Sequence, residues 1–170
     1  MPETVTACIA LGSNLDDPRE QVRRGFAALA TLPQSRLLAR SRLYRTPPWG
    51  ITEQPDFINA AARLETSLPP RALLDALRAI ETRAGRVRGV RNGPRVLDLD
   101  LLLYGDRIVD DPDLVVPHPR LHERAFVLLP LADVAPELDV PGRGRVRDLL
   151  ARVDASGCMA IDRGSRKKLF

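Results

Sequence analysis

The sequence predicts a single domain of the α+β class. Its 170 residues and 44% hydrophobic composition are enough for one ordinary domain with a buried core and too few for two. Strand-like apolar runs alternate with helical patterns too seldom for a doubly wound parallel sheet. No apolar run approaches the roughly 18 residues that span a bilayer. An acid stands near the N-terminus, where a signal peptide has basic residues, so no export is expected.

The first half of the chain predicts three strands and one helix. The β-branched apolar run that begins at Val5 is typical of a buried strand, and Gly12-Ser13-Asn14 ends it. Asp17-Pro18-Arg19-Glu20 predicts a helix start, with Asp17 as N-cap and Glu20 reaching back. The elements expected in this half are strands at 5–11, 36–44 and 57–64, a helix ending near Pro33 and a proline-rich loop at 45–55.

The second half begins with a helix that Pro69-Pro70 opens and Gly85 can end. Its apolar stripe is formed by Leu73, Leu74, Leu77, Ile80 and Ala84. The segment 96–104 alternates and then becomes continuously apolar, as a central strand does. The other expected elements are a loop at 86–94, a turn at 105–106 before Ile108-Val109, a weak helix at 120–135 interrupted by Pro130, a short helix at 146–153 and a strand near Met159.

Charge is distributed unevenly along the chain. The formal net charge is +4, but the tail 162–170 carries four positive charges and one negative, so the rest of the chain is close to neutral. Six arginines and one acid lie between Arg78 and Arg95, and six aspartates and one arginine lie between Asp98 and Asp113. Charge runs are most often solvated loops. A basic segment followed by an acidic one also suits a polyanion held together with a cation.

Asp98 and Asp100 are the strongest candidates for metal ligands. Two residues apart on a strand, both carboxylates project from one face, with Cα atoms under roughly 7 Å apart. Two such carboxylates repel each other unless a cation lies between them. Mg²⁺ uses one or two carboxylates and completes its shell with water and phosphate. The alternative is a polar face on an edge strand, but the following Leu-Leu-Leu favours a buried strand, where free carboxylates are costly.

Basic side chains flank the carboxylate pair. The loop entering the strand carries arginines that can close over a phosphate chain, namely Arg86, Arg88, Arg91 and Arg95. His118 is interpreted as a phosphate hydrogen-bond donor. His122 stays unassigned, because Pro119 disfavours the regular helix that would pair the two histidines on one metal.

Two aromatics and an amide lie near the proline-rich loop, in Thr46-Pro47-Pro48-Trp49-Gly50 and Phe57-Ile58-Asn59. A flat heterocycle between aromatic faces, with Asn59 at its polar edge, is one interpretation. A loop tryptophan folded onto the core is the other. The residues alone do not choose between them.

In order along nearly the whole chain, these motifs resemble the 6-hydroxymethyl-7,8-dihydropterin pyrophosphokinase family of folate biosynthesis. The Gly-Pro-Arg-x-x-Asp-Leu-Asp block is the most specific of them. The matching segments are 10–15 (ALGSNL), 44–48 (YRTPP), 54–60 (QPDFINA), 85–88 (GRVR), 93–100 (GPRVLDLD) and 116–126 (VPHPRLHERAF). The family often has Trp before Gly-Pro-Arg, where this chain has Asn92, and an aliphatic residue where it has Trp49.

The resemblance implies a fold similar to a ferredoxin-like sandwich, with a mostly antiparallel central sheet and helices packed on its faces. It implies transfer of a diphosphate group from ATP, as co-substrate, to the hydroxymethyl group of the pterin, with release of AMP and two Mg²⁺ ions as cofactors. The implied domain covers 1–161, and the basic tail 162–170 is expected to be disordered.

The resemblance also implies roles for individual residues. Asp98 and Asp100 would hold the metal, and Arg86 and Arg95 would act in catalysis. The implied ATP-binding residues are Leu74, Glu81, Arg88, Leu101, His118 and Arg124. The implied pterin-binding residues are Thr46, Phe57, Asn59 and Phe126, and Pro47 and Trp49 are expected to border the same pocket.

Two other functions compete with this one. An RNA-binding α+β module would need exposed aromatics on adjacent strands, and the chain shows no such pattern. A different Mg²⁺-dependent phosphoryl transferase could use the same carboxylates, but the pterin-pocket residues argue against it. The two cysteines, Cys8 and Cys158, form no CxxC motif, so a reducing cytoplasm is the expected location. A monomer without nucleic-acid or membrane partners is expected.

Overall fold

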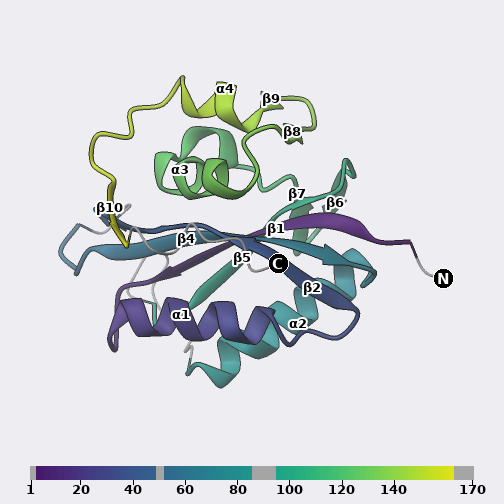
Figure 1. The fold of residues 1–170 in the computed structure, drawn as a ribbon, viewed down its shortest axis with the longest axis horizontal. Coiled ribbons are helices and arrows are strands. Elements are labelled where there is room, and N and C mark those ends of the chain that lie inside the picture. Colours follow the sequence, from purple (N-terminus) through teal and green to yellow (C-terminus); the bar gives the residue numbers. More distant parts are fainter. Residues whose placement is uncertain (1–2, 49–51, 86–94, 163–170) are drawn as a thin grey trace.

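A three-layer α+β arrangement organises the chain, with helices on both faces of one antiparallel sheet (Figure 1). The computed structural model describes residues 3–48, 52–85 and 95–162. The six-stranded sheet has the order β10-β3-β4-β1-β5, and β2 also pairs with β4. Its strands are β1 (Val5–Ser13), β2 (Ser35–Arg40), β3 (Leu43–Thr46), β4 (Phe57–Thr66), β5 (Asp98–Tyr104) and β10 (Met159–Asp162).

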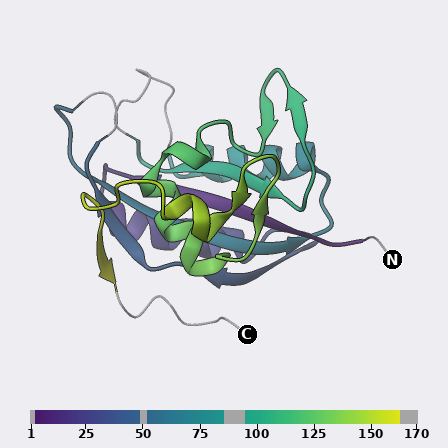
Figure 2. The same cartoon turned by 90° about the horizontal axis from the view of Figure 1, so that it is seen from above.

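Helices α1 (Pro18–Leu29) and α2 (Pro70–Arg83) cover one face, and α3 (Ala125–Val134) and α4 (Val146–Leu150) lie over the other (Figure 1). The smaller elements are the hairpins β6 (Val109–Asp111) with β7 (Leu114–Val116) and β8 (Asp139–Val140) with β9 (Gly144–Arg145), and the 3-10 turn η1 (Leu121–Glu123). Viewed from above, the β6–β7 hairpin extends beyond the sheet (Figure 2). No helix of the described residues is long and apolar enough to cross a membrane.

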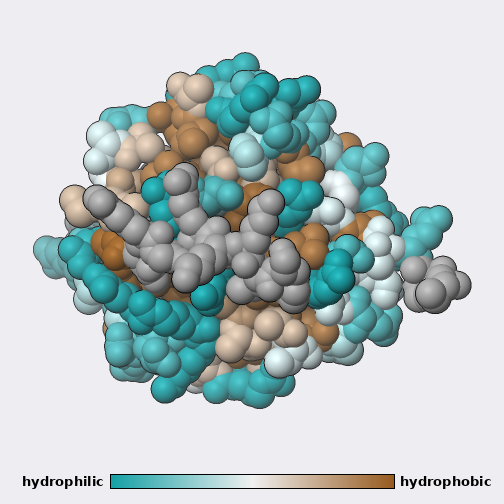
Figure 3. Space-filling model, in the orientation of Figure 1, coloured by the Kyte–Doolittle hydropathy of each residue, from teal (hydrophilic) through white to brown (hydrophobic). Residues whose placement is uncertain are grey.

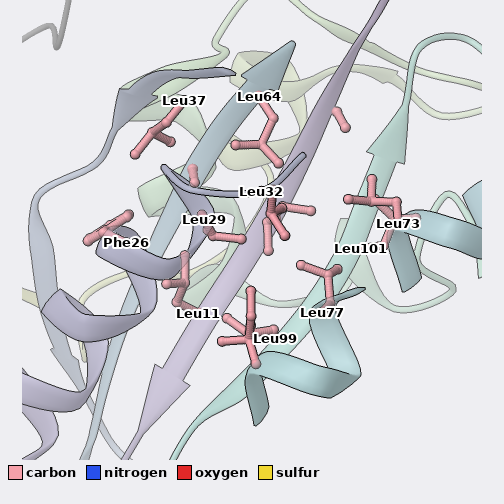
Figure 4. Packing of buried hydrophobic residues seen from close by; sticks show 14 of the residues in the cluster. Leu11, Phe26, Leu29, Leu32, Leu37, Leu64, Leu73, Leu77, Leu99 and Leu101 are labelled. Carbon is pink, nitrogen blue, oxygen red and sulfur yellow. The ribbon is translucent and has the colours of Figure 1, made fainter. Parts of the chain in front are cut away.

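Alternation along the central strands builds two separate cores. Ile9 and Leu11 of β1 face α1 and α2, whereas the neighbouring Cys8 faces α3. On the first side, Leu99 of β5 lies beside Leu77 of α2, whereas Leu11 of the adjacent strand lies toward α1 (Figure 4). In the space-filling view, hydrophobic side chains also reach the surface at the level of the sheet (Figure 3).

Most expected elements are confirmed, and several details are wrong. Asp17 precedes α1 but has a left-handed backbone (φ 62°) and makes no capping hydrogen bond; an N-cap needs an extended backbone to aim its side chain at the helix. Glu20 instead pairs with Arg24, at 3.4 Å. Pro130 does not interrupt α3, which continues to Val134. Asp162, assigned to the tail, ends β10; residues 163–170 lie outside the described residues.

The single strand expected at 36–44 is divided in two at Ser41. The Ser41 hydroxyl accepts the Ala61 N–H at 2.8 Å, and the Ser41 N–H donates to the Ala61 carbonyl at 2.9 Å. At this position the Ser41 side chain, and not a backbone carbonyl, accepts a hydrogen bond from β4. Regular pairing resumes with β3, which begins at Leu43.

The carboxylate of Asp133 ties α3 to the sheet. It accepts hydrogen bonds from the Arg42 guanidinium (3.1 and 3.2 Å), the Arg42 N–H (3.1 Å) and the Tyr44 hydroxyl (2.7 Å). Burial and the neighbouring Asp133 raise the pKa of Tyr44, so its hydroxyl stays a donor. This anchor fixes the helix whose first residues line the site described next.

Candidate active site

A cavity with about 740 Å³ of empty space, which includes the part open to solvent, lies between the sheet and the start of α3. Strands β1, β3, β4 and β5 contribute its floor, and α3 contributes one wall. Among the described residues, its lining consists of Ala10, Leu11, Gly12, Thr46, Pro47, Phe57, Asn59, Arg95, Asp98, Asp100, Arg124, Phe126 and Val127.

The register of β1, β4 and β5 places Asn59 and Asp98 on opposite sides of Gly12 in the cavity floor. Gly12 of β1 lies opposite Asn59 of β4 on one side and opposite Asp98 of β5 on the other. With strands about 4.8 Å apart, the backbones at Asn59 and Asp98 are separated by roughly two strand spacings. A Cβ at position 12 would lie only 2.7 Å from Asn59 Oδ1. The absence of a side chain at Gly12 therefore leaves the space that the Asn59 amide occupies.

The carboxylate pair has the geometry that alternation predicts. Asp98 and Asp100 are partly exposed on one face of β5, whereas Leu99 and Leu101 between and beyond them are buried in the core at 4% exposure each. Both carboxylates line the cavity. No group of three His, Cys, Asp or Glu residues that could hold a metal occurs among the described residues. Two hard oxygen donors with room beside them fit Mg²⁺, which takes its other ligands from water and phosphate.

A second cavity, with about 1580 Å³ of empty space that includes the part open to solvent, lies along the outer edge of β5. Helix α2 and the β6–β7 hairpin form its walls. Its described lining is Leu74, Arg78, Glu81, Thr82, Arg95, Asp98, Leu99, Asp100, Leu101, Pro112, Asp113, Leu114, Val115, His118 and Pro119. Asp98, Asp100 and Arg95 line both cavities. The carboxylate pair and one guanidinium thus stand where the two cavities meet.

His118 is held as a neutral donor beside the second cavity. Burial, and then the positive charge of Arg124, lower its pKa from 6.5 to about 4. Its Nδ1 accepts the Arg120 N–H at 3.3 Å, so the proton of the neutral ring is on Nε2. A neutral imidazole with a fixed Nε2–H can donate one hydrogen bond to a phosphate oxygen.

A profile of the 7,8-dihydro-6-hydroxymethylpterin-pyrophosphokinase family matches residues 8–136. The chain belongs to this family. It is 51% identical over 149 residues to a 2-amino-4-hydroxy-6-hydroxymethyldihydropteridine pyrophosphokinase of Pseudomonas aeruginosa, covering 88% of this chain and 92% of the relative. A relative with the same name from Methylorubrum extorquens is 46% identical over 156 residues, covering 92% and 98%. Membership of a pyrophosphokinase family favours the transferase over the RNA-binding interpretation.

Solved structures share the fold. The chain superposes on a Plasmodium falciparum HPPK-DHPS structure with pteroate at a TM-score of 0.70, with 16% identity over 88% of this chain. It spans 42% of that longer chain. The antiparallel sheet with helices on both faces, expected from the resemblance, is thereby confirmed.

The structure sorts the expected site residues of this pyrophosphokinase family member into the two cavities. Five of the expected pterin-binding residues line the first cavity: Thr46, Pro47, Phe57, Asn59 and Phe126. Four of the expected ATP-binding residues line the second: Leu74, Glu81, Leu101 and His118. Arg124, also expected near ATP, lines the first cavity instead, because it directly precedes α3. Trp49, Arg86 and Arg88 lie outside the described residues.

A supporting residue that lines neither cavity was not predicted, although its motif was recognised. Asn14 is 2% exposed and joins two segments that enter the site. Its Oδ1 accepts the Arg95 N–H at 2.8 Å, and its Nδ2 donates to Gln54 Oε1 (2.9 Å) and to the Pro55 carbonyl (3.0 Å). A polar residue directly after a buried strand was the available signal, but its partners are 40 or more residues away in the sequence.

Proposed function

We propose that this chain transfers a diphosphate group from ATP to the hydroxymethyl group of 6-hydroxymethyl-7,8-dihydropterin and releases AMP, a step of folate biosynthesis. The single observation that carries the proposal is the meeting of two cavities at Asp98, Asp100 and Arg95 in a chain of the pyrophosphokinase family. The smaller cavity suits a pterin ring and the larger a nucleoside triphosphate. The group to be transferred would then lie at the junction.

The first cavity supports the pterin site. Phe57 and Phe126 offer aromatic faces for a flat ring, and Thr46 and Asn59 offer polar groups for its edge. Pro47 lines the same cavity, and Trp49 is proposed as a further cover. Since Asn59 and Asp98 flank Gly12, a ring that meets Asn59 can direct its hydroxymethyl group toward the carboxylate pair.

The second cavity supports the ATP site. Leu74, Glu81 and Leu101 would border the adenosine, and His118 would donate its Nε2–H to a phosphate oxygen. Arg88 and Arg124 would neutralise phosphate charge. Arginine suits this role because its planar guanidinium donates to two oxygens at once.

In the proposed reaction, the hydroxymethyl oxygen attacks the β-phosphorus of ATP and the bond from that phosphorus to the bridging oxygen of AMP breaks. The hydroxyl proton passes to solvent. Two Mg²⁺ ions held by Asp98 and Asp100, when bound, would orient the phosphates and neutralise their charge. Arg86 and Arg95 would donate to the oxygens on which negative charge develops.

The activity is tested by incubating the full chain with ATP, Mg²⁺ and 6-hydroxymethyl-7,8-dihydropterin and separating the nucleotides. AMP and a pterin diphosphate are expected in equal amounts. Release of ADP would overturn diphosphate transfer, because it means that only the terminal phosphate moves. We further propose a monomer acting on these small molecules in the cytoplasm, without nucleic-acid or membrane partners; the free thiols of Cys8 and Cys158 accord with a reducing compartment.

A further inference from the structure

We infer that Glu81 is a positioning residue for the carboxylate pair, because its side chain holds the backbone of β5 between Asp98 and Asp100. The inference rests on the proposed function of that pair. Glu81 is also expected beside the adenosine. The inference adds a second role, in which Glu81 acts on the carboxylate pair by holding the backbone of β5.

The contact that carries the inference lies on the outer edge of β5. Glu81, in the last turn of α2, is 6% exposed, and its Oε2 accepts the Leu99 N–H at 2.8 Å in a buried hydrogen bond. Leu99 is the residue between the two aspartates. On its other edge β5 pairs with β1, where Leu99 lies opposite Leu11. The carboxylate therefore takes the place that the carbonyl of another strand would have.

The position along the strand makes this bond important. The pairing of β5 with β1 begins at Asp98 opposite Gly12, so Leu99 is only the second residue of the ladder. A strand end is held by few backbone hydrogen bonds, so each one there restrains the strand. Fixing Leu99 from the α2 side therefore fixes the directions of its two neighbours, whose carboxylates must share one cation site.

Direct coordination by Glu81 is the competing role. The three acids at 81, 98 and 100 all line the second cavity. They do not form a group of three that could hold a metal, and no such group occurs in the part of the chain that the structure describes. One oxygen of the Glu81 carboxylate, Oε2, accepts a hydrogen bond from the strand backbone at Leu99. This geometry favours a role in holding the strand.

The two roles are separated by whether position 81 needs an acceptor or a charge. Glu81→Gln keeps an acceptor oxygen and removes the charge, whereas Glu81→Leu removes both. Asp75→Leu, at an exposed acid of the same helix, is the matched control. Binding of Mn²⁺ is measured by electron paramagnetic resonance with α,β-methylene-ATP, in which the bond that would break is replaced.

We expect Asp75→Leu to bind Mn²⁺ within about threefold of the unmodified chain and Glu81→Leu to bind it at least about tenfold more weakly, with Glu81→Gln binding it clearly more tightly than Glu81→Leu. Equal losses of Mn²⁺ affinity in Glu81→Gln and Glu81→Leu would overturn the inference, because the negative charge of Glu81 would then be the property that supports binding. Unchanged binding in Leu would also overturn it. If the unmodified chain binds no Mn²⁺ with the analogue, the proposed function itself fails.

A measurement on the unmodified chain covers the case in which Glu81→Leu does not fold. The Leu99 amide should exchange its hydrogen slowly, like the amides paired inside the sheet, because its acceptor is buried. Fast exchange at Leu99 beside slow exchange at Asp100, which lies opposite Ala10 of β1, would overturn the inference.

Discussion

The Asn59 side-chain amide donates a hydrogen bond to Thr46 Oγ1 over 2.6 Å, which links β4 to the end of β3 inside the first cavity. Thr46 is 1% exposed, so this partner is fixed by the core and in turn fixes how Asn59 faces the cavity. In the proposed pterin site, recognition of the edge of the ring would therefore depend on this pair of residues.

Replacing Asn59 with alanine should weaken pterin binding by roughly 10- to 100-fold, because an unmet polar group in a buried site costs about 1–3 kcal/mol. Thr46→Val should have a smaller effect in the same direction, since Asn59 then loses its orientation. Calorimetric titration with the pterin and separately with ATP tests this. Equal losses for both ligands would point to a folding defect instead.

Gly12→Ala should weaken pterin binding by displacing the Asn59 amide. The new methyl group would lie 2.7 Å from Asn59 Oδ1, so the amide must move off its position. We expect pterin affinity to fall at least about tenfold, with ATP affinity retained. Gly157→Ala is the control, because its methyl group would make only ordinary contact with Pro47, at 3.6 Å. Wild-type pterin affinity in Gly12→Ala would mean that the amide does not recognise the ring.

Asp98→Asn and Asp100→Asn keep the side-chain shape and remove one charge. Loss of a metal ligand should reduce turnover by more than the roughly 10- to 100-fold that outer-sphere changes cost. Mg²⁺-dependent ATP binding should fall with it. In the absence of metal, relief of carboxylate repulsion should leave the melting temperature unchanged or slightly higher. A clearly lower melting temperature would identify these aspartates as structural, and the metal site would have to be sought elsewhere.

Arg95→Ala should lower turnover about 100-fold or more while changing ATP affinity little, because charge on the bridging oxygens develops in the transition state. Arg95→Lys should recover only part of the loss, since an ammonium group cannot form the two parallel hydrogen bonds of a guanidinium. Single-turnover kinetics alongside ATP titrations separate the two quantities. Full recovery by lysine would show that only the charge is needed.

His118 should make stability depend on pH on the acid side. Its pKa in the folded protein is about 4, below the usual 6.5, so the unfolded chain binds more protons between these values. The contribution of neutral His118 to the free energy of unfolding is fully present above about pH 6.5. It decreases as the pH falls toward 4, by up to about 3 kcal/mol. Urea unfolding at several pH values, with His118→Asn as comparison, measures this. An equally steep decrease in His118→Asn would assign the effect to other groups.

The parts of the site that depend on local periodicity were predictable. Alternation in Val-Leu-Asp-Leu-Asp places Asp98 and Asp100 on one face of any strand, and β5 confirms this. The role of Glu81 was not predictable from spacing, because its acceptor atom meets Leu99 only after α2 packs on the sheet. Asn14 is a similar case.

The wrong details of the fold have the same origin. The division between β2 and β3 depends on Ala61, a residue of another strand, which pairs with the Ser41 side chain. The cap at Asp17 failed because the chain turns there with a left-handed backbone, which composition does not reveal. In the first case a residue distant in sequence outweighed the local strand preference, and in the second the backbone conformation outweighed the capping preference of the residue type.

The outer edge of β5 has a consequence for association between molecules. An open strand edge can recruit a strand from another chain and start aggregation. Here the Leu99 N–H is occupied by a carboxylate and the Leu102 carbonyl accepts the His118 N–H at 3.0 Å. One N–H and one carbonyl of this edge are thus satisfied from within the chain. The sheet can keep this side free for a small ligand without offering it to a second protein as a template.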